Sequence, residues 1–173
     1  MVLQPHSYGS PRCSLQPASL CLLSERTADR KQLIWRSFDP VKGPLNELTR
    51  MGTEADADYD WALSPNARTI AVRKNREASL DFLDLTNHTV RHVAVEGWKL
   101  TTNLDWAPDG KGLFTCGIRA EGATLLYVDL KGKAQSIWEY SGDYLWGLLS
   151  PDGQHLAMGA STERNNVWMM ESF

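Results

Sequence analysis

The sequence predicts an all-β fold, a β-propeller of four blades, and three observations predict it. A turn motif of the Ser-Pro-Asp-Gly kind recurs with its proline at 65, 108 and 151, so that both spacings are 43 residues. Short runs of alternating apolar residues flank each copy, and no long segment has helical periodicity. Seven tryptophans lie at or beside these runs, and tryptophan suits a half-buried sheet surface.

Each copy of the motif stands between similar strand-like runs. The runs before the turn are YDWAL, TNLDW and YLWGLL, and the runs after it are TIAVRK, GLFTCG and HLAMGA. The third runs are SLDFLDL, TLLYVDL and NNVWMME, and two copies continue into VRHVAV and AQSIWEY. Proline presets φ at the first central position of the turn, and Asn or Asp followed by Gly tolerates the tight reversal.

A weaker copy of the repeat precedes these three. The segment Gln16–Cys21 aligns with the segment that begins at Ser64-Pro65, at a spacing of 48, and LCLLSE, QLIWRSFD and NELTRM come after it as strand-like runs. Four short strands per repeat of 40–50 residues are typical of propeller blades. A β-sandwich is the alternative, but it does not require the same turn at every fourth strand. The predicted organisation is an unstructured start at 1–7 and a propeller segment at 8–173, with blades at 8–51, 59–95, 102–140 and 144–171.

Composition excludes several functional classes. The chain of 173 residues is long enough to bury a sizeable core, and its net charge is -3. Its 18 lysines and arginines are spread along the sequence, so no nucleic-acid partner is expected. No apolar run is long enough to span a membrane, and the start MVLQPHSYGSPRC is not a secretory signal.

The last blade lacks a fourth strand-like run. An unclosed blade would present an edge of unpaired backbone groups, which natural proteins usually cover. We therefore expect either further blades in a larger propeller or a homodimer that forms through the open edge.

Cysteines and histidines do not predict a metal site. Cys13 and Cys21 could meet across two adjacent strands, but two buried thiols are the simpler expectation, and Cys116 is expected in the core. No CxxC pair occurs, and the spacing of four between His88 and His92 suits a metal only on a helix. None of the four histidines has a recognisable Ser or Cys partner, so no catalytic residue, metal or cofactor is expected.

Three alternating acids, Asp56, Asp58 and Asp60, could hold Ca²⁺, as the first part of an EF-hand loop does. The glycine and the distal glutamate of that loop are missing here. A solvated loop between blades is therefore the better interpretation.

The candidate ligand site is predicted from propeller geometry. The first strand of each blade lines the central channel, and the loop before it opens on one face. Polar and aromatic groups that converge on one opening suit a small-molecule or peptide site. The residues expected at this channel mouth are Asp60, Trp61, Asn103, Asp105, Tyr144 and Trp146. The alternative for the tryptophans is packing between blades, and for Asp105 it is hydrogen bonding to a neighbouring blade.

On these motifs the sequence resembles the TolB-like, WD-repeat-like β-propeller family. The family signature is an apolar residue, Ser-Pro-Asp-Gly, a strand, a variable loop and a strand ending in Asp-Leu. Leu149–Gly153 with Val167–Met169 carries it, as does Trp106–Gly110 with Leu126–Leu130. The second blade has Asn66-Ala67 where Asp-Gly is expected, and the first blade keeps only Pro17.

The resemblance covers about residues 8–171 and is specific for the fold. It implies that the chain is the C-terminal propeller portion of a larger bacterial protein. Some proteins of this kind carry a Ser/Thr kinase or winged-helix domain upstream. It also makes a periplasmic location plausible. The kinase motifs themselves do not occur in this sequence.

The sequence supports three functional hypotheses. The first is a non-catalytic module of a sensing or signalling protein, which binds a protein, a peptide or a small ligand at the channel face. The second is the gating propeller of a hydrolase, which requires a G-x-S-x-G domain that this chain does not contain. The third is a stand-alone structural protein that dimerises through its open edge. Fold alone does not choose among them.

Overall fold

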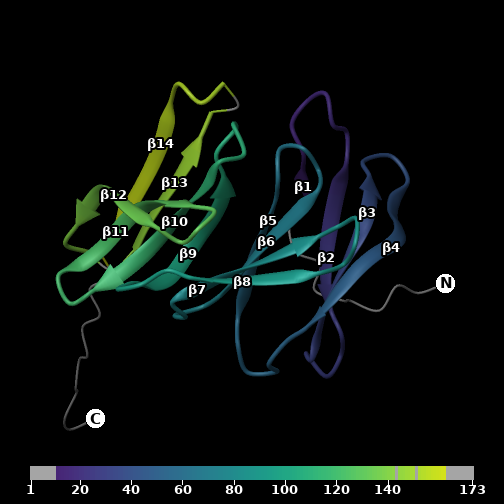
Figure 1. Cartoon of the computed structure of the whole chain (residues 1–173), viewed down its shortest axis with the longest axis horizontal. Coiled ribbons are helices and arrows are strands. Elements are labelled where there is room, and N and C mark those ends of the chain that lie inside the picture. Colours follow the sequence, from purple (N-terminus) through teal and green to yellow (C-terminus); the bar gives the residue numbers. More distant parts are fainter. Residues whose placement is uncertain (1–10, 143, 151, 163–173) are drawn as a thin grey trace, which may run out of the picture.

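The computed structural model describes residues 11–142, 144–150 and 152–162. Within these residues all regular structure is β: three four-stranded sheets and one two-stranded sheet, set side by side (Figure 1). The described residues contain no helix that could cross a membrane. The predicted all-β propeller architecture is confirmed. The start predicted at 1–7 and the last strand-like run, NNVWMME, lie outside the described residues.

Each sheet is a meander of consecutive antiparallel strands. The first sheet consists of β1 (Arg12–Cys13), β2 (Cys21–Arg26), β3 (Gln32–Asp39) and β4 (Gly43–Gly52). The second consists of β5 (Tyr59–Leu63), β6 (Thr69–Lys74), β7 (Ser79–Asp84) and β8 (Val90–Ala94). The third consists of β9 (Lys99–Trp106), β10 (Gly112–Arg119), β11 (Gly122–Asp129) and β12 (Ala134–Tyr140). The fourth consists of β13 (Tyr144–Leu149) and β14 (Leu156–Ser161).

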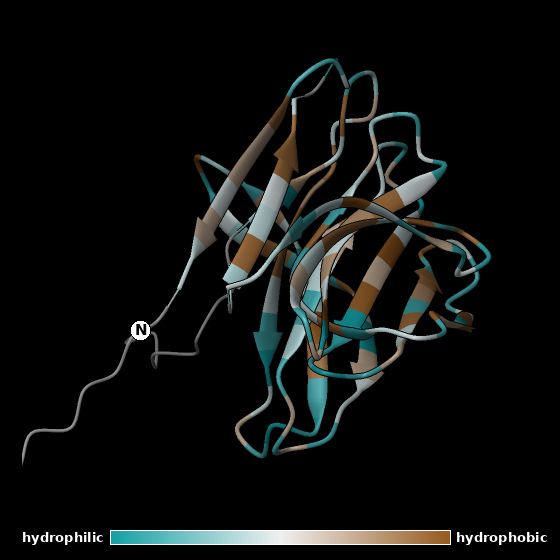
Figure 2. Ribbon diagram, turned by 90° about the vertical axis from the view of Figure 1, so that its left-hand side faces the viewer, coloured by the Kyte–Doolittle hydropathy of each residue, from teal (hydrophilic) through white to brown (hydrophobic). Residues whose placement is uncertain are grey.

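The hydrophobic cores lie between neighbouring sheets. The core between the first two sheets contains Leu22, Leu33, Trp35, Trp61, Leu63, Ile70, Val72 and Leu83. The next core contains Ala62, Ala71, Leu80, Phe82, Val93, Val95, Trp98, Leu100, Leu104, Trp106, Leu113, Leu126 and Val128. Trp61 and Ala62 are consecutive in β5 and enter different cores, because successive side chains of a strand point to opposite faces. Figure 2 shows the hydrophobic positions along the strands and the hydrophilic ones mainly in the turns.

Two tryptophans join the sheets by hydrogen bonds as well as by packing. The indole N–H of Trp61 donates to Ser24 Oγ of the first sheet at 2.8 Å, and its ring meets Trp35 edge-on, with the ring centres 6.1 Å apart. The indole N–H of Trp106 donates to the carbonyl oxygen of Ala62 at 3.1 Å. Buried indole N–H groups usually find such a partner, and these two bonds connect neighbouring sheets. Cys116 is buried between the third and fourth sheets, as predicted.

The repeated motif forms the same turn in each of the last three sheets. In the second sheet the amide of Ala67 donates to the carbonyl of Ser64, and Gly110 and Gly153 make the equivalent bond in their sheets. These three residues are 43 positions apart, and all have positive φ, at 58°, 70° and 70°. Positive φ is easy for glycine and unfavourable for alanine, so the departure of Ala67 from the motif has a structural cost.

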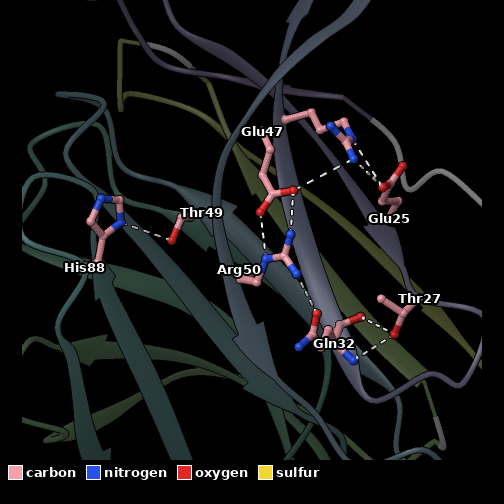
Figure 3. A network of polar contacts seen from close by, with 8 residues as sticks. Glu25, Thr27, Gln32, Glu47, Thr49, Arg50 and His88 are labelled. Carbon is pink, nitrogen blue, oxygen red and sulfur yellow. Dashed lines mark hydrogen bonds and ion pairs between the residues drawn. The ribbon is translucent and has the colours of Figure 1, made fainter.

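The face of the first sheet that points away from the second sheet carries a network of charged side chains beside the buried Leu23 and Ile34. Ser24 faces Trp61, so the next residue, Glu25, lies on the other side of the sheet, where it accepts two bonds from Arg36, at 3.0 and 3.1 Å. On the same side Glu47 accepts two bonds from Arg50, at 2.7 and 2.8 Å, and this pairing lowers the pKa of Glu47 (Figure 3). Such ion pairs contribute little stability each, but they give this outer face a hydrated surface.

Exchanging glycine and alanine at the turn should shift stability in opposite directions. Gly110→Ala should lower the free energy of unfolding by about 1 kcal/mol, because it adds an unfavourable positive φ, and a Cβ there would meet no atom within 4 Å. Ala67→Gly should be neutral or raise it by up to about 1 kcal/mol, since relief of strain exceeds the added chain entropy. Urea unfolding monitored by circular dichroism measures both. A loss of stability in both variants would contradict this account of the turn.

Removing the hydroxyl that Trp61 uses should weaken the contact between the first two sheets. Ser24→Ala leaves the buried indole N–H without its partner, and should lower the free energy of unfolding by about 1–3 kcal/mol. Ser19→Ala, at an exposed loop position of the same sheet, serves as the control and should change little. Thermal and urea unfolding of the two variants side by side provide the measurement.

Candidate functional site

The first strands of the sheets lie next to one another along the inner edge of the fold. β1, β5, β9 and β13 each occupy one end of their sheet's strand order. β5 contacts both β1 and β9, and β9 contacts β13. These are the strands on which the sequence places its candidate ligand residues.

Arg12 connects three sheets at this inner edge. From β1 its guanidinium reaches Asp60 Oδ1 of the second sheet at 3.2 Å and donates to the carbonyl of Leu104 of the third sheet at 3.3 Å. It also lies over the ring of Trp61, 5.9 Å from the ring centre. This side chain thereby ties the two-residue strand β1 to the second and third sheets.

Asp60 also faces a second cation. Arg73 of β6 is only 5% exposed, and its Nη2 lies 3.9 Å from Asp60 Oδ2. Burial lowers the pKa of Arg73, and the nearby Asp60 carboxylate opposes that effect. Asp60 is thus held by a partly exposed arginine on one side and a buried one on the other. The inner edge is therefore a network in which these opposite charges neutralise one another.

Asp105 belongs to the same cluster electrostatically. Burial raises the pKa of its carboxyl, as the Asp60 charge also does to a lesser extent, whereas Arg12 and a hydrogen bond from the Trp106 amide lower it. Its hydrogen bond stays within its own strand, because Oδ1 accepts from the Trp106 amide at 3.1 Å. Asp60 accepts the equivalent bond from Trp61 at 2.8 Å.

The structure brings together only part of the predicted channel-mouth set. Asp60 and Asp105 share the inner charge cluster, whereas Trp61 is buried between sheets and bonded to Ser24. Asn103 has positive φ, and its side-chain amide donates to the carbonyl of Gly147 at 2.6 Å, so it joins the third and fourth sheets.

Tyr144 and Trp146 lie on the fourth sheet, where they are 42% and 36% exposed. Neither ring lines the four hollows that the structure describes on other parts of the surface. A ligand site at the six residues stays a prediction.

A groove of about 900 Å³ lies at the other end of the first strands, where β5 and β9 end. The β1–β2 loop and the motif turns of the second and third sheets form it, and Trp106 and Leu130 also line it. Three prolines, Pro17, Pro65 and Pro108, come from these three elements. None of the six predicted residues lines this groove. The residues that form the groove belong to the repeated turns, and the sequence indicated only a structural role for those turns.

The β1–β2 loop is closed by a disulfide. Cys13 and Cys21 are register partners on β1 and β2, and their sulfurs are bonded. The expectation of two buried thiols is therefore wrong: the strand pairing places the two side chains opposite each other, and Cys13 is exposed. The covalent link stabilises the loop, residues 14–20, that forms one wall of the groove.

The histidines and the acidic run make other contacts. His88 lies in the β7–β8 turn, with Nδ1 3.3 Å from Thr49 Oγ1 of the first sheet (Figure 3), and His92 pairs with Asp81 across β7 and β8 at 2.8 Å. Asp58 is exposed and lies 3.4 Å from an arginine, Arg30. Among the described residues no group of three or more His, Cys, Asp or Glu side chains could hold a metal ion.

This set of features, meandering sheets joined face to face around an inner edge, defines the protein as a β-propeller. The model is similar to the crystal structure of TolB from Acinetobacter baumannii (TM-score 0.66, 17% identity, 93% of this chain and 39% of that one). It is also similar to a candidate TolB from Agrobacterium tumefaciens (0.64, 22%, 90% and 54%). A prolyl endopeptidase is similar too (0.58, 16%, 88% and 26%). The predicted resemblance to TolB-like propellers is confirmed as a likeness of fold.

The chain spans 26% to 54% of the length of these three structures. No protein-family model and no curated protein matches the sequence. Identities below 25% show the fold and leave the activity open.

Replacing Asp105 should change how stability depends on pH. Because the carboxyl pKa is raised in the folded state, the cost of burying its charge is present above that pKa and disappears as the pH falls through it. Asp105→Asn should therefore be more stable than the parent protein at pH 7, and the difference should shrink as the pH approaches about 4. Thermal midpoints over this pH range measure the effect. A difference that grows towards acid pH would contradict the assignment.

Proposed function

We propose that this chain is the binding part of a β-propeller protein and that it holds a peptide or protein segment in the groove between its first three sheets. The observation that carries the proposal is the groove itself, whose walls come from three separate sheets. Binding sites are typically concave, mainly apolar and largely preformed, with a few polar groups that orient the ligand.

The chemistry of the groove suits an extended segment. Its apolar surface comes from prolines, Trp106 and Leu130, while Asn66, Arg68 and Asp109 supply polar groups at exposed positions. The backbone around these side chains is fixed, because Ser64 Oγ accepts bonds from the amides of Arg68 and Thr69. A rigid wall lowers the entropy lost on binding. These features support a non-catalytic role in recognition.

The wider setting of the module is also part of the proposal. The chain matches only part of each longer propeller structure, and we propose that it functions within a larger propeller protein, with sensing or signalling as the role to be tested. A second candidate is the gating propeller of a hydrolase, favoured by the likeness to a prolyl endopeptidase. The two candidates differ in what happens to the molecule that enters the groove. A sensing module retains it as a ligand, whereas a gating propeller lets it through as a substrate for another domain.

Filling the groove should abolish binding without unfolding the protein. Peptides selected from a random library on the parent protein should bind Asn66→Trp at least about tenfold more weakly, because the indole would occupy the groove. Asn87→Trp is a matched control: each asparagine lies in a turn and its Oδ1 accepts an amide two residues on, and Asn87 does not line the groove. Fluorescence anisotropy gives the affinities.

Failure to enrich any peptide, or equal affinities for the two variants, would overturn the proposal. Unfolding midpoints of both variants, measured in parallel, separate a blocked groove from a damaged fold.

A further inference from the structure

A second hollow, of about 690 Å³, lies between the outer strands of the second and third sheets. Its walls are β8, the β8–β9 connection, the end of β10 and the β11–β12 turn with the start of β12. The charged and titratable residues that line it are Arg91, His92, Glu96, Arg119, Lys131 and Lys133. Four permanent cations thus face one carboxylate in a chain whose net charge is -3. We call this hollow the basic groove.

The β11–β12 turn is anchored so that its two lysines stand beside β8. Gly132 is buried with φ of 89°, and a Cβ at this position would overlap the carbonyl oxygen of Ala94. Only glycine allows this close approach of backbone to backbone. Asp129 Oδ1 accepts the amides of Lys131 and Lys133, at 2.8 and 3.0 Å, which fixes the residues on both sides of Gly132.

The two arginines are held by single bonds that leave most of their donors available. Arg91 donates from Nη1 to the carbonyl of Leu130 at 2.8 Å and lies over the ring of Phe82. Arg119 donates from Nε to the carbonyl of Gly97 and stacks 3.5 Å from the centre of the Trp98 ring. A guanidinium has five N–H donors, so each can still bind a carboxylate.

The lysine ammonium groups are also available. Among the residues that the structure describes, no carboxylate lies within ion-pair distance of the Lys131 or Lys133 ammonium. The backbone amides of Lys133 and Lys131 lower the pKa of Asp129, and the two ammonium charges lower it to a smaller extent. The cations are therefore positioned by the fold and not neutralised by it.

The wall formed by β8 is a sheet edge. β8 is the last strand of the second sheet, and within the described chain it pairs with β7 alone. Gly132 already lies against the carbonyl of Ala94, the last residue of β8. An added extended segment would therefore pair with the outward backbone groups of β8 before Ala94. Carboxylates at alternate positions of that segment would share one face and could reach the cations.

We propose that the basic groove binds an acidic peptide segment in extended conformation along β8. A peptide suits this groove better than a nucleic acid, because Glu96 within the groove repels an unbroken row of phosphates. A peptide, in contrast, alternates its charges with neutral groups that pair with a strand edge. This inference does not depend on the proline-lined groove or on the function proposed for it.

The test uses a fluorescein-labelled peptide of alternating glutamate and valine, with the lysine–valine peptide as the charge control. Binding to the whole chain is measured by fluorescence anisotropy at low and high salt. We expect saturable binding of the glutamate peptide alone, weakened by salt. The double variant Lys131→Glu/Lys133→Glu should bind it at least about tenfold more weakly.

Lys31→Glu/Lys42→Glu is the matched control, since it makes the same charge change at two exposed turn positions of the first sheet. Its affinity should stay within about twofold of the parent, as expected of charges beyond a Debye length of the bound peptide. An equal loss in both double variants would overturn the proposal, because it would indicate attraction to overall charge. Absence of saturable binding would overturn it as well.

Two further arms test the chemical class and the binding mode. A single-stranded oligonucleotide of equal charge should bind more weakly than the peptide, and tighter binding at the same lysines would overturn the assignment to a peptide. Methylation of the valine amide nitrogens should weaken binding, because it removes donors that pair with the edge of β8. Undiminished binding of the methylated peptide would overturn the extended mode.

Discussion

The face-to-face packing of neighbouring sheets governs where the cores, the charge cluster and the grooves of this protein lie. Each inner sheet buries side chains on both faces, so each first strand must supply apolar groups in two directions. Trp61 and Ala62 in β5 show this directly, because they enter different cores. The indole bonds of Trp61 and Trp106 add hydrogen bonds between the packed sheets. The proline-lined groove and the basic groove both form where two or three of these sheets meet.

Electrostatics at the inner edge depends on the same packing. The first strands lie close together, so polar side chains on them are removed from water and must find partners there. Arg12 supplies one such partner by reaching from the first sheet to Asp60 of the second and the backbone of the third. Asp105 has fewer favourable contacts to offset the burial of its carboxylate, and its pKa is therefore raised. The cluster connects the first three sheets.

The strands and their order could be predicted from the sequence to a large extent. The runs YDWAL and TIAVRK coincide with β5 and β6, because alternation and turn chemistry are local properties. The repeated proline turns also predicted one architecture for all the sheets. The pairing of Cys13 with Cys21 was not predictable, since it depends on the register of a two-residue strand that has almost no local signal. The proline-lined groove was missed for a related reason, because a turn motif does not reveal what its copies jointly surround.

Local patterns in the chain specify the class of fold, the positions of most strands and the turn residues, because periodicity and φ preference act over a few neighbours. Which side chains meet depends instead on how the sheets pack. Lysines and arginines that are spread along the chain converge in the basic groove, because Gly132 allows the β11–β12 turn to approach β8. Trp61, expected at a channel opening, is buried because the face of β5 that carries it packs on the first sheet. Contacts between residues far apart in sequence depend on the packing of whole sheets, which no local pattern specifies.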